Sequence, residues 1–270
     1  MKNSFMSLLL ACCFAQAGAQ ELFVFTEPAS NMPTNSIAAR MLAGFYDQKK
    51  GNGTDIHLMP EIHYGISPKL MVQAQGFISN RNTSGLTAEG GGVYTQYKFL
   101  NLDDVQQHFR MAAYGRYSFN NAAIEQEAIE IAMQNSGYEF GVIATQLLHK
   151  LAISSSVSYE RALNNGTKNR FPEHHSNSAM NYTLSFGQLV LPKKYTGYDQ
   201  TNLNLMIEFL GQRLNSNGKS YLDIAPSIQF IIMSKARVDL AYRQPLYSDM
   251  YRMAPKGFLV RFEYNFYNVF

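Results

Sequence analysis

Residues Gly257–Phe270 read GFLVRFEYNFYNVF, and apolar and polar side chains alternate along this stretch. Successive side chains of a β-strand point to opposite faces, so the alternation predicts a strand with one largely aromatic face. That face comprises Phe258, Val260, Phe262, Tyr264, Phe266, Asn268 and Phe270. The opposite face carries Arg261 and Glu263 at its centre. In a soluble sandwich the aromatic face would pack on a second sheet, so the rest of the chain must decide between a sandwich and a membrane barrel.

The same two-residue period recurs along the whole chain. In each segment apolar residues occupy one parity, and charged, amide or hydroxyl residues are concentrated on the other. The alternating segments are 37–45, 56–66, 70–78, 93–99, 109–119, 138–145, 151–160, 181–186, 203–209, 222–230, 237–243 and 257–270. They predict an all-β protein of about twelve strands, with ten or fourteen strands as the alternatives.

The lengths of the connections between these segments decide the class of fold. Short links at 67–68, 101–105, 149–150 and 234–236 alternate with longer polar links at 48–54, 80–87, 120–136, 163–178, 215–219 and 245–256. Only the link 191–200 is long where a short one is expected. Tight turns at one end and long loops at the other are typical of a transmembrane antiparallel up-and-down β-barrel. A sandwich gives no reason for this segregation, so we predict the barrel.

Composition agrees with a protein whose apolar surface faces outward. Only 16% of the residues are charged, whereas 46% are hydrophobic and the chain holds 17 Tyr and 18 Phe. No stretch approaches the roughly 18 apolar residues that a membrane-spanning helix needs. The formal net charge of +3 is too small to indicate a nucleic-acid partner.

The first residues predict export. Residues 1–19 combine Lys2, an apolar run and the small residues Ala17-Gly18-Ala19, which are typical of a cleaved signal peptide. The alternative is a lipoprotein signal with Leu9-Leu10-Ala11-Cys12 as its lipidation box. Residues 20–35, with Pro28 and Pro33, cannot easily form a full strand, and we predict a periplasmic lead-in or small plug. Residues 36–270 then form the barrel.

The chain end resembles a known assembly signal. Terminal Phe270, with Phe266 and Phe262 in step behind it, is similar to the C-terminal signal of Gram-negative outer-membrane barrels. The resemblance implies a location in the outer membrane, contact with its lipid, and delivery by the barrel-assembly machinery. The segments 27–33 and 60–70 also resemble small "transporter" barrels grouped with porins of the phenol-degradation meta pathway. That narrower resemblance implies uptake or efflux of a small-molecule solute.

The polar parity of the strands predicts what lines the lumen. Eight strands close on an interior filled by side chains and 16–18 leave an aqueous channel, so twelve predict a narrow lumen. The predicted inward charged residues and histidines are Arg40, His57, Glu61, His63, Arg110, Arg116, Glu139, Glu160, Glu208, Asp223, Arg237, Asp239, Arg243, Arg261 and Glu263. They can form a constriction that selects polar solutes, or pair across the lumen and block it. We therefore predict a narrow channel or transporter, with a structural or ligand-binding barrel closed by ion pairs as the alternative.

This assignment of faces also predicts two mutational outcomes. Phe262→Arg, on the lipid face, should cost about 2–4 kcal/mol near mid-depth. Glu263→Gln, on the lumen face, should assemble nearly normally.

Two motifs raise other chemistries. His57, Met59, Glu61 and His63 share one face of one strand, but side chains two residues apart are about 6.5–7 Å apart and need neighbours to complete a metal site. We predict pore lining there, and neither a metal nor another cofactor. His174-His175-Ser176-Asn177 resembles the His/Ser dyad motif of outer-membrane lipid hydrolases, in which Ser acts as nucleophile. The motif ends a polar loop, so we predict that the chain is not an enzyme.

One outer loop has its own pattern. In residues 122–133, Ile124, Ala128 and Ile131 recur at helical spacing among glutamates. The pattern predicts a short amphipathic helix that either caps the rim or folds inward as a lid.

Overall fold

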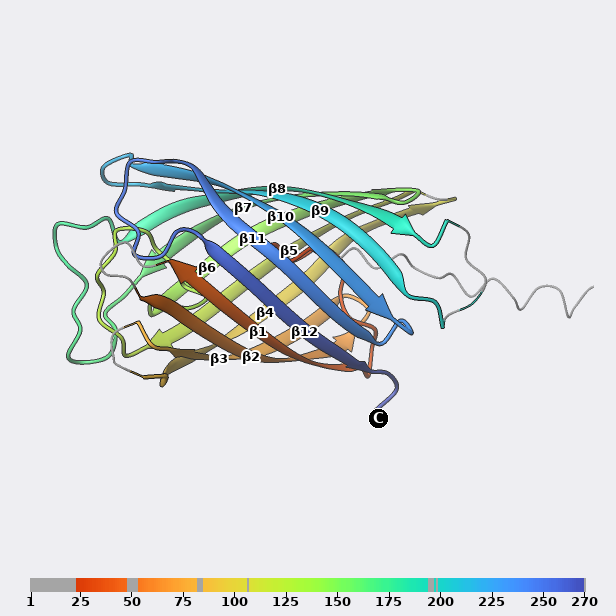
Figure 1. Cartoon of the computed structure of the whole chain (residues 1–270), viewed down its shortest axis with the longest axis horizontal. Coiled ribbons are helices and arrows are strands. Elements are labelled where there is room, and N and C mark those ends of the chain that lie inside the picture. Colours follow the sequence, from red (N-terminus) through yellow and green to blue (C-terminus); the bar gives the residue numbers. More distant parts are fainter. Residues whose placement is uncertain are drawn as a thin grey trace, which may run out of the picture.

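Twelve strands form one closed antiparallel barrel, in which consecutive strands pair and β1 closes on β12 (Figure 1). The computed structural model describes residues 23–47, 53–81, 85–105, 107–193, 197 and 199–269. The bounds are β1 Ile37–Asp47, β2 Thr54–Ser67, β3 Leu70–Ser79, β4 Thr87–Asp104, β5 Gln107–Asn120, β6 Gly137–Leu148, β7 Leu151–Ala162, β8 Ser178–Leu191, β9 Asn202–Leu214, β10 Ser220–Ile232, β11 Ala236–Ser248 and β12 Gly257–Phe266. The predicted twelve-stranded up-and-down barrel is confirmed.

None of the described residues belongs to a helix that is long and apolar enough to cross a membrane.

The connections differ in length between the two ends of the barrel. At one end β6 and β7 are joined through His149 and Lys150, and β10 and β11 through Met233, Ser234 and Lys235. His149, Met233 and Ser234 have φ of 57°, 51° and 55°, the left-handed backbone that closes such tight turns. The long loops lie at the other end, on the left of Figure 1, opposite the C-terminus.

The seam between the first and last strands has a charged centre. Arg40 of β1 lies opposite Glu263 of β12 on one side and opposite Glu61 of β2 on the other. Directly opposed side chains on one face of an antiparallel pair lie about 4.5–5.5 Å apart at Cβ. One arginine therefore connects three neighbouring strands from inside the barrel.

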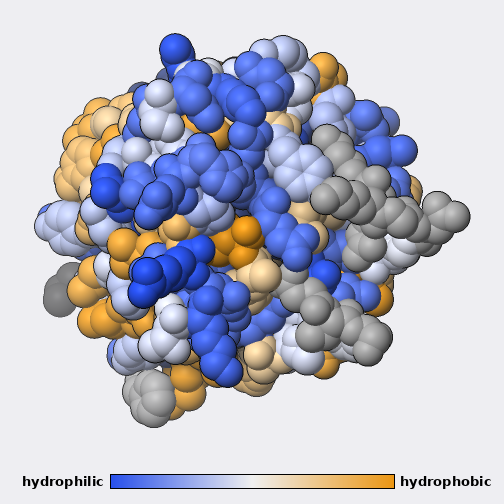
Figure 2. Space-filling model, turned by 90° about the vertical axis from the view of Figure 1, so that its left-hand side faces the viewer, coloured by the Kyte–Doolittle hydropathy of each residue, from blue (hydrophilic) through white to orange (hydrophobic). Residues whose placement is uncertain are grey.

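The outer surface is apolar along the strands. Phe258 is 63% exposed, Ile62 59% and Phe262 49%, although each belongs to a fully paired strand. In the view onto the loop end, hydrophilic side chains cover much of the face, and hydrophobic ones appear mainly around its margin, with a smaller group near the centre (Figure 2). The usual order of a soluble protein, with apolar residues inside, is thus reversed along the strands.

Two non-strand segments occupy the lumen. The lead-in, residues 23–36, buries Phe23 and Val24 in a cluster with Met206 and Leu259. The inserted loop, residues 121–136, buries Ile129 and Ile131 in a second cluster that includes Leu214 and Tyr221. Each segment carries apolar side chains into an otherwise polar interior, and the strands supply a few inward apolar residues to receive them.

The last strand is shorter than the alternation in the sequence suggested. β12 ends at Phe266, and Asn268 adopts a φ of 55°, a left-handed conformation that Asn tolerates and that interrupts a strand. Of the resembled assembly signal, Phe262 and Phe266 are exposed on the outer surface at 49% and 48%. Phe270 and the predicted signal peptide lie outside the described residues.

Candidate functional site

The structure places the fifteen predicted lumen residues at buried or partly buried positions of the strands. Arg40, His57, Glu61, His63, Glu139, Glu160, Glu208, Asp223, Arg237, Asp239, Arg261 and Glu263 are each at most 8% exposed. The side chains of Arg110, Arg116 and Arg243 are 15–18% exposed. The structure joins most of them in three ion-pair networks.

The first network lies at the seam. Arg40 donates to Glu263 at 2.8 Å, to Glu61 at 3.1 Å and to Glu27 of the lead-in at 2.8 Å. Arg237 adds a second cation to Glu263 at 2.8 Å. Arg261 pairs with Asp239 at 2.5 Å, and His63 contacts Glu61 at 3.1 Å. Ion pairs therefore connect four neighbouring strands, β11, β12, β1 and β2.

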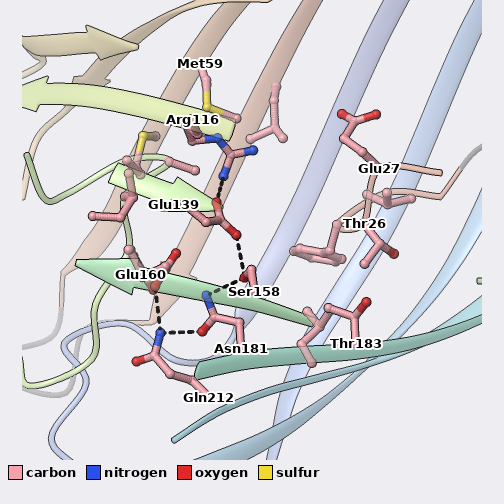
Figure 3. Close-up of a pocket in the computed structure, with 18 of the residues that line it drawn as sticks. Thr26, Glu27, Met59, Arg116, Glu139, Ser158, Glu160, Asn181, Thr183 and Gln212 are labelled. Carbon is pink, nitrogen blue, oxygen red and sulfur yellow. Dashed lines mark hydrogen bonds and ion pairs between the residues drawn. The ribbon is translucent and has the colours of Figure 1, made fainter. Parts of the chain in front are cut away.

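The second network crosses β5 to β9 (Figure 3). Arg116 pairs with Glu139 at 2.9 Å, and Glu139 also accepts hydrogen bonds from Tyr114 at 2.6 Å and Ser158 at 2.7 Å. Farther along, Gln212 Nε2 donates to Glu160 at 3.2 Å and to Asn181 at 2.8 Å. Glu160 lies directly opposite Glu139 in the β6–β7 register. Two carboxyl groups thus face each other on one wall of the lumen.

The third network joins two predicted lumen residues to Arg252, which the alternation in the sequence did not predict. Asp223 of β10 pairs with Arg243 of β11 and with Arg252 of the following loop, both at 2.6 Å. The Arg252 guanidinium also lies 3.8 Å from the centre of the Tyr221 ring, a cation–π contact. Arg252 stands in a long loop without alternation, so its sequence context carried no signal that it would point inward.

A smaller cluster was missed for a different reason. Asp55 pairs with His57 at 2.9 Å and with Arg81 at 2.9 Å. Asp55 shares the parity of His57 and lies one residue before the predicted segment 56–66. Arg81 follows β3 in a turn and had no such signal.

The lead-in is held in the lumen by specific contacts. The carboxylate of Glu208 accepts hydrogen bonds from the backbone N–H groups of Val24 at 2.8 Å, Phe25 at 3.0 Å and Thr26 at 3.0 Å. Arg261 donates to the carbonyls of Val24 and Phe23 at 3.0 and 2.6 Å. The barrel wall therefore binds both the donors and the acceptors of this backbone.

Side chains of the wall also bind the rest of the lead-in. Gln96 donates to the carbonyl of Pro28 at 3.1 Å, and Arg110 donates to Ser30 at 2.7 Å. Burial alone would raise the pKa of the Glu27 carboxyl, but the charges of Arg40, His63 and Arg261 lower it to about 2. The Glu27–Arg40 pair therefore stays ionised at neutral pH.

The predicted helix in the inserted loop is wrong. Residues 121–136 form bends and one hydrogen-bonded turn, in which the carbonyl of Glu130 accepts from Met133, Gln134 and Asn135. The loop folds inward, and Gln212 of β9 binds both the N–H and the carbonyl of Ile129, at 3.0 and 2.7 Å. These contacts satisfy the backbone from the wall and replace the internal hydrogen bonds of a helix.

A cavity of about 290 Å³ lies between the lead-in and the inserted loop. We call it the chamber. The lead-in lines it with Phe25 and Glu27, and the inserted loop with Ile129 and Glu130. The barrel wall contributes charged side chains of both signs, namely Arg40, Glu61, Arg116, Glu139, Glu160, Arg243 and Arg261, and Arg81 adds a further cation. The chamber is the space in which a solute inside the barrel would lie.

The residues of the possible lipid-hydrolase motif and of the possible metal site contact neighbouring groups of the barrel. Ser176 is 1% exposed, its hydroxyl donates to the Ser178 carbonyl at 2.9 Å and accepts from the Ser216 N–H at 3.2 Å, and neither bond involves a histidine. Over the described residues, no group of three or more His, Cys, Asp or Glu is arranged to hold a metal ion. His57 and His63 instead contact Asp55 and Glu61.

Comparison with known proteins gives a fold likeness. No protein-family model matches the chain, and no curated protein sequence matches it. An outer membrane channel from Pseudomonas putida F1 has a TM-score of 0.55 at 12% identity, over 90% of this chain and 99% of that one. The NanC porin has a TM-score of 0.48 at 11% identity, over 84% and 97%. Pseudomonas aeruginosa OpdL has 0.40 at 10%, over 86% and 97%. The likeness to the first of these shows that the chain has the barrel fold of an outer-membrane channel.

Proposed function

We propose that this protein spans the outer membrane of a Gram-negative bacterium and carries small solutes through a narrow lumen lined by charges of both signs. The apolar outer surface and the paired strands support the membrane location, because only a closed barrel leaves no strand edge unpaired in lipid. The single observation that carries the channel role is the chamber inside the barrel. The predicted cleaved signal peptide and the barrel-assembly machinery as a partner belong to this proposal, as does the grouping with phenol-pathway barrels.

Passage requires movement of at least one inserted segment. The lead-in and the inserted loop both line the chamber, the lead-in toward the end of the barrel at which β12 ends and the inserted loop toward the end with the long loops. The lead-in is held by hydrogen bonds and one ion pair to the wall, and its first residues, Phe23 to Phe25, pack in an apolar cluster. We therefore propose the lead-in as the movable plug.

The alternative is a barrel that stays closed and serves a structural or ligand-binding role. It is favoured by the same ion-pair networks, which satisfy most of the charged groups in the lumen. Planar-bilayer conductance of the purified full chain separates the two functions. Discrete conductance steps at neutral pH support the channel, and their absence, in the wild type and in the plug variant below, supports the closed barrel.

Glu208→Gln should release the plug. The carboxylate of Glu208 accepts hydrogen bonds from three backbone N–H groups of the lead-in. The substitution keeps the side-chain size but replaces one accepting oxygen with an NH₂ group, which cannot accept. A hydrogen bond to a charged group contributes about 1.5–3 kcal/mol, so the undocked fraction should rise at least about tenfold. Ala29 is fully buried, so labelling of Ala29→Cys by a charged thiol reagent measures undocking. We expect faster labelling and higher conductance.

A matched control is Glu89→Gln. Glu89 is also buried, at 6% exposure, but its carboxylate accepts a hydrogen bond from Ser79, and no hydrogen bond or ion pair among the described residues joins it to the lead-in. Equal labelling rates in the two variants would contradict the role of Glu208 in holding the plug.

A further inference from the structure

Two carboxyl groups that line the chamber have no ion-pair partner among the described side chains. Seven arginines in or beside it pair with seven carboxylates through the three networks and the Asp55 cluster. Two further carboxylates line the chamber, Glu130 and Glu160, and neither forms an ion pair with any described Lys, Arg or His. The unpaired charge in the chamber is therefore acidic.

Glu160 is the more buried of the two. It is 5% exposed and lines the chamber, yet its hydrogen-bond contacts with the described residues are to neutral amides, including that of Gln212 at 3.2 Å. Glu139 lies directly opposite on β6, where like charges destabilise a strand pair, and Arg116 pairs with Glu139 alone. Burying a carboxylate without a counter-ion is costly, so the ionised form of Glu160 is stable there only when a cation lies beside it.

Glu130 approaches the same region from the inserted loop. The Ile129 backbone is bound by Gln212, the residue that also donates to Glu160, so loop and β7 meet there. Burial would raise the pKa of Glu130, but the charges of Arg81, Arg243 and Arg252 lower it below its ordinary value, so this second carboxylate is ionised at neutral pH.

The other residues that line the chamber indicate which kind of cation fits it. The acidic groups are not grouped closely enough to hold a bare metal ion, as judged over the described residues. Apolar side chains from three directions also line the chamber, namely Phe25, Ile129 and Leu210. At about 290 Å³ the space is near the lower end of small-molecule pockets. We infer that the chamber binds a small organic cation, with an ammonium group at Glu160 and Glu130 and an apolar body against these side chains. This inference rests on the proposed channel function and names the class of its solute.

Calorimetry on the purified full chain in detergent tests the site directly. Butylammonium is the probe, with butyrate and 1-butanol as controls of the same length and opposite or no charge. We expect wild type to bind butylammonium alone. Glu160→Gln should weaken that binding at least about tenfold, because a charged hydrogen-bond acceptor is lost. Glu89→Gln, which neutralises a buried carboxylate outside the chamber lining, should bind like wild type.

The outcomes separate the site from the channel. Unchanged affinity in Glu160→Gln, or equal binding of the three probes, overturns the cation site. Should Glu160→Gln fail to fold, Glu130→Gln in the loop gives the same test, and unchanged affinity there overturns the site. Glu160-dependent binding without conductance in bilayers would refute the channel and keep the site. Conductance without such binding would refute the site and keep the channel.

Discussion

Glu263→Gln should lower the free energy of unfolding by about 3–5 kcal/mol, the usual cost of removing one partner of a buried ion pair. Glu263 is 4% exposed and accepts from both Arg40 and Arg237 at 2.8 Å. Its neutralisation leaves Arg237, which is 1% exposed, with Asp239 at 3.3 Å as its remaining carboxylate. Urea unfolding of the protein reconstituted in vesicles, followed by circular dichroism, measures the change.

The same substitution at Glu160 is the matched comparison. Glu160 is equally buried and also faces the lumen, but it forms no ion pair with a described side chain and lies opposite Glu139. Its neutralisation should leave the free energy of unfolding unchanged or raise it. Equal losses in Glu263→Gln and Glu160→Gln would show that the arrangement of charges inside the barrel does not govern its stability.

Phe262→Arg should lower the free energy of unfolding in a bilayer by about 2–4 kcal/mol. Phe262 lies near the middle of β12, is 49% exposed on the outer surface, and pairs in register with the apolar residues Met41 and Val238. An arginine there would place a charge in the hydrocarbon region. Unfolding titrations of the protein in vesicles of defined lipid measure the difference from wild type.

Position along the strand provides the control. Phe258 is 63% exposed but lies one residue from the start of β12, at the loop end. Arginine costs only about 0–1 kcal/mol near the membrane interface, so Phe258→Arg should be mild. A loss at Phe258 as large as that at Phe262 would refute the depth that we assign to the two residues.

The strands could be predicted because the two faces of a barrel strand produce a local alternation of apolar and polar residues in the sequence. Each strand separates lipid from lumen, so the alternation between one residue and the next is enough to find it. Loop lengths then distinguish the two ends. Strand ends are less determined: β12 stops at Phe266 because of the backbone of Asn268, although the aromatic parity continues.

The partners of the lumen charges could not be predicted in the same way. Parity gives the face of a side chain, whereas its ion pair depends on register and on segments that enter from elsewhere. The expectation that Glu263→Gln is harmless illustrates this, because its two arginines come from β1 and β11. The helix predicted in the inserted loop failed for a related reason: wall residues such as Gln212 bind that backbone directly.

The charged seam between β1 and β12 favours one register when the barrel closes. In the observed register Arg40 faces Glu263, and a slip of two residues along β12 would set it opposite Arg261 or Asn265 instead. Such a slip preserves the apolar and polar faces, so lipid alone would not penalise it. It would, however, exchange an attraction for a repulsion or for an uncharged neighbour at the seam that closes the barrel. The charges of Arg40 and Glu263 thus favour the observed register of β1 and β12 over registers shifted by two residues, which hydrophobicity alone does not distinguish.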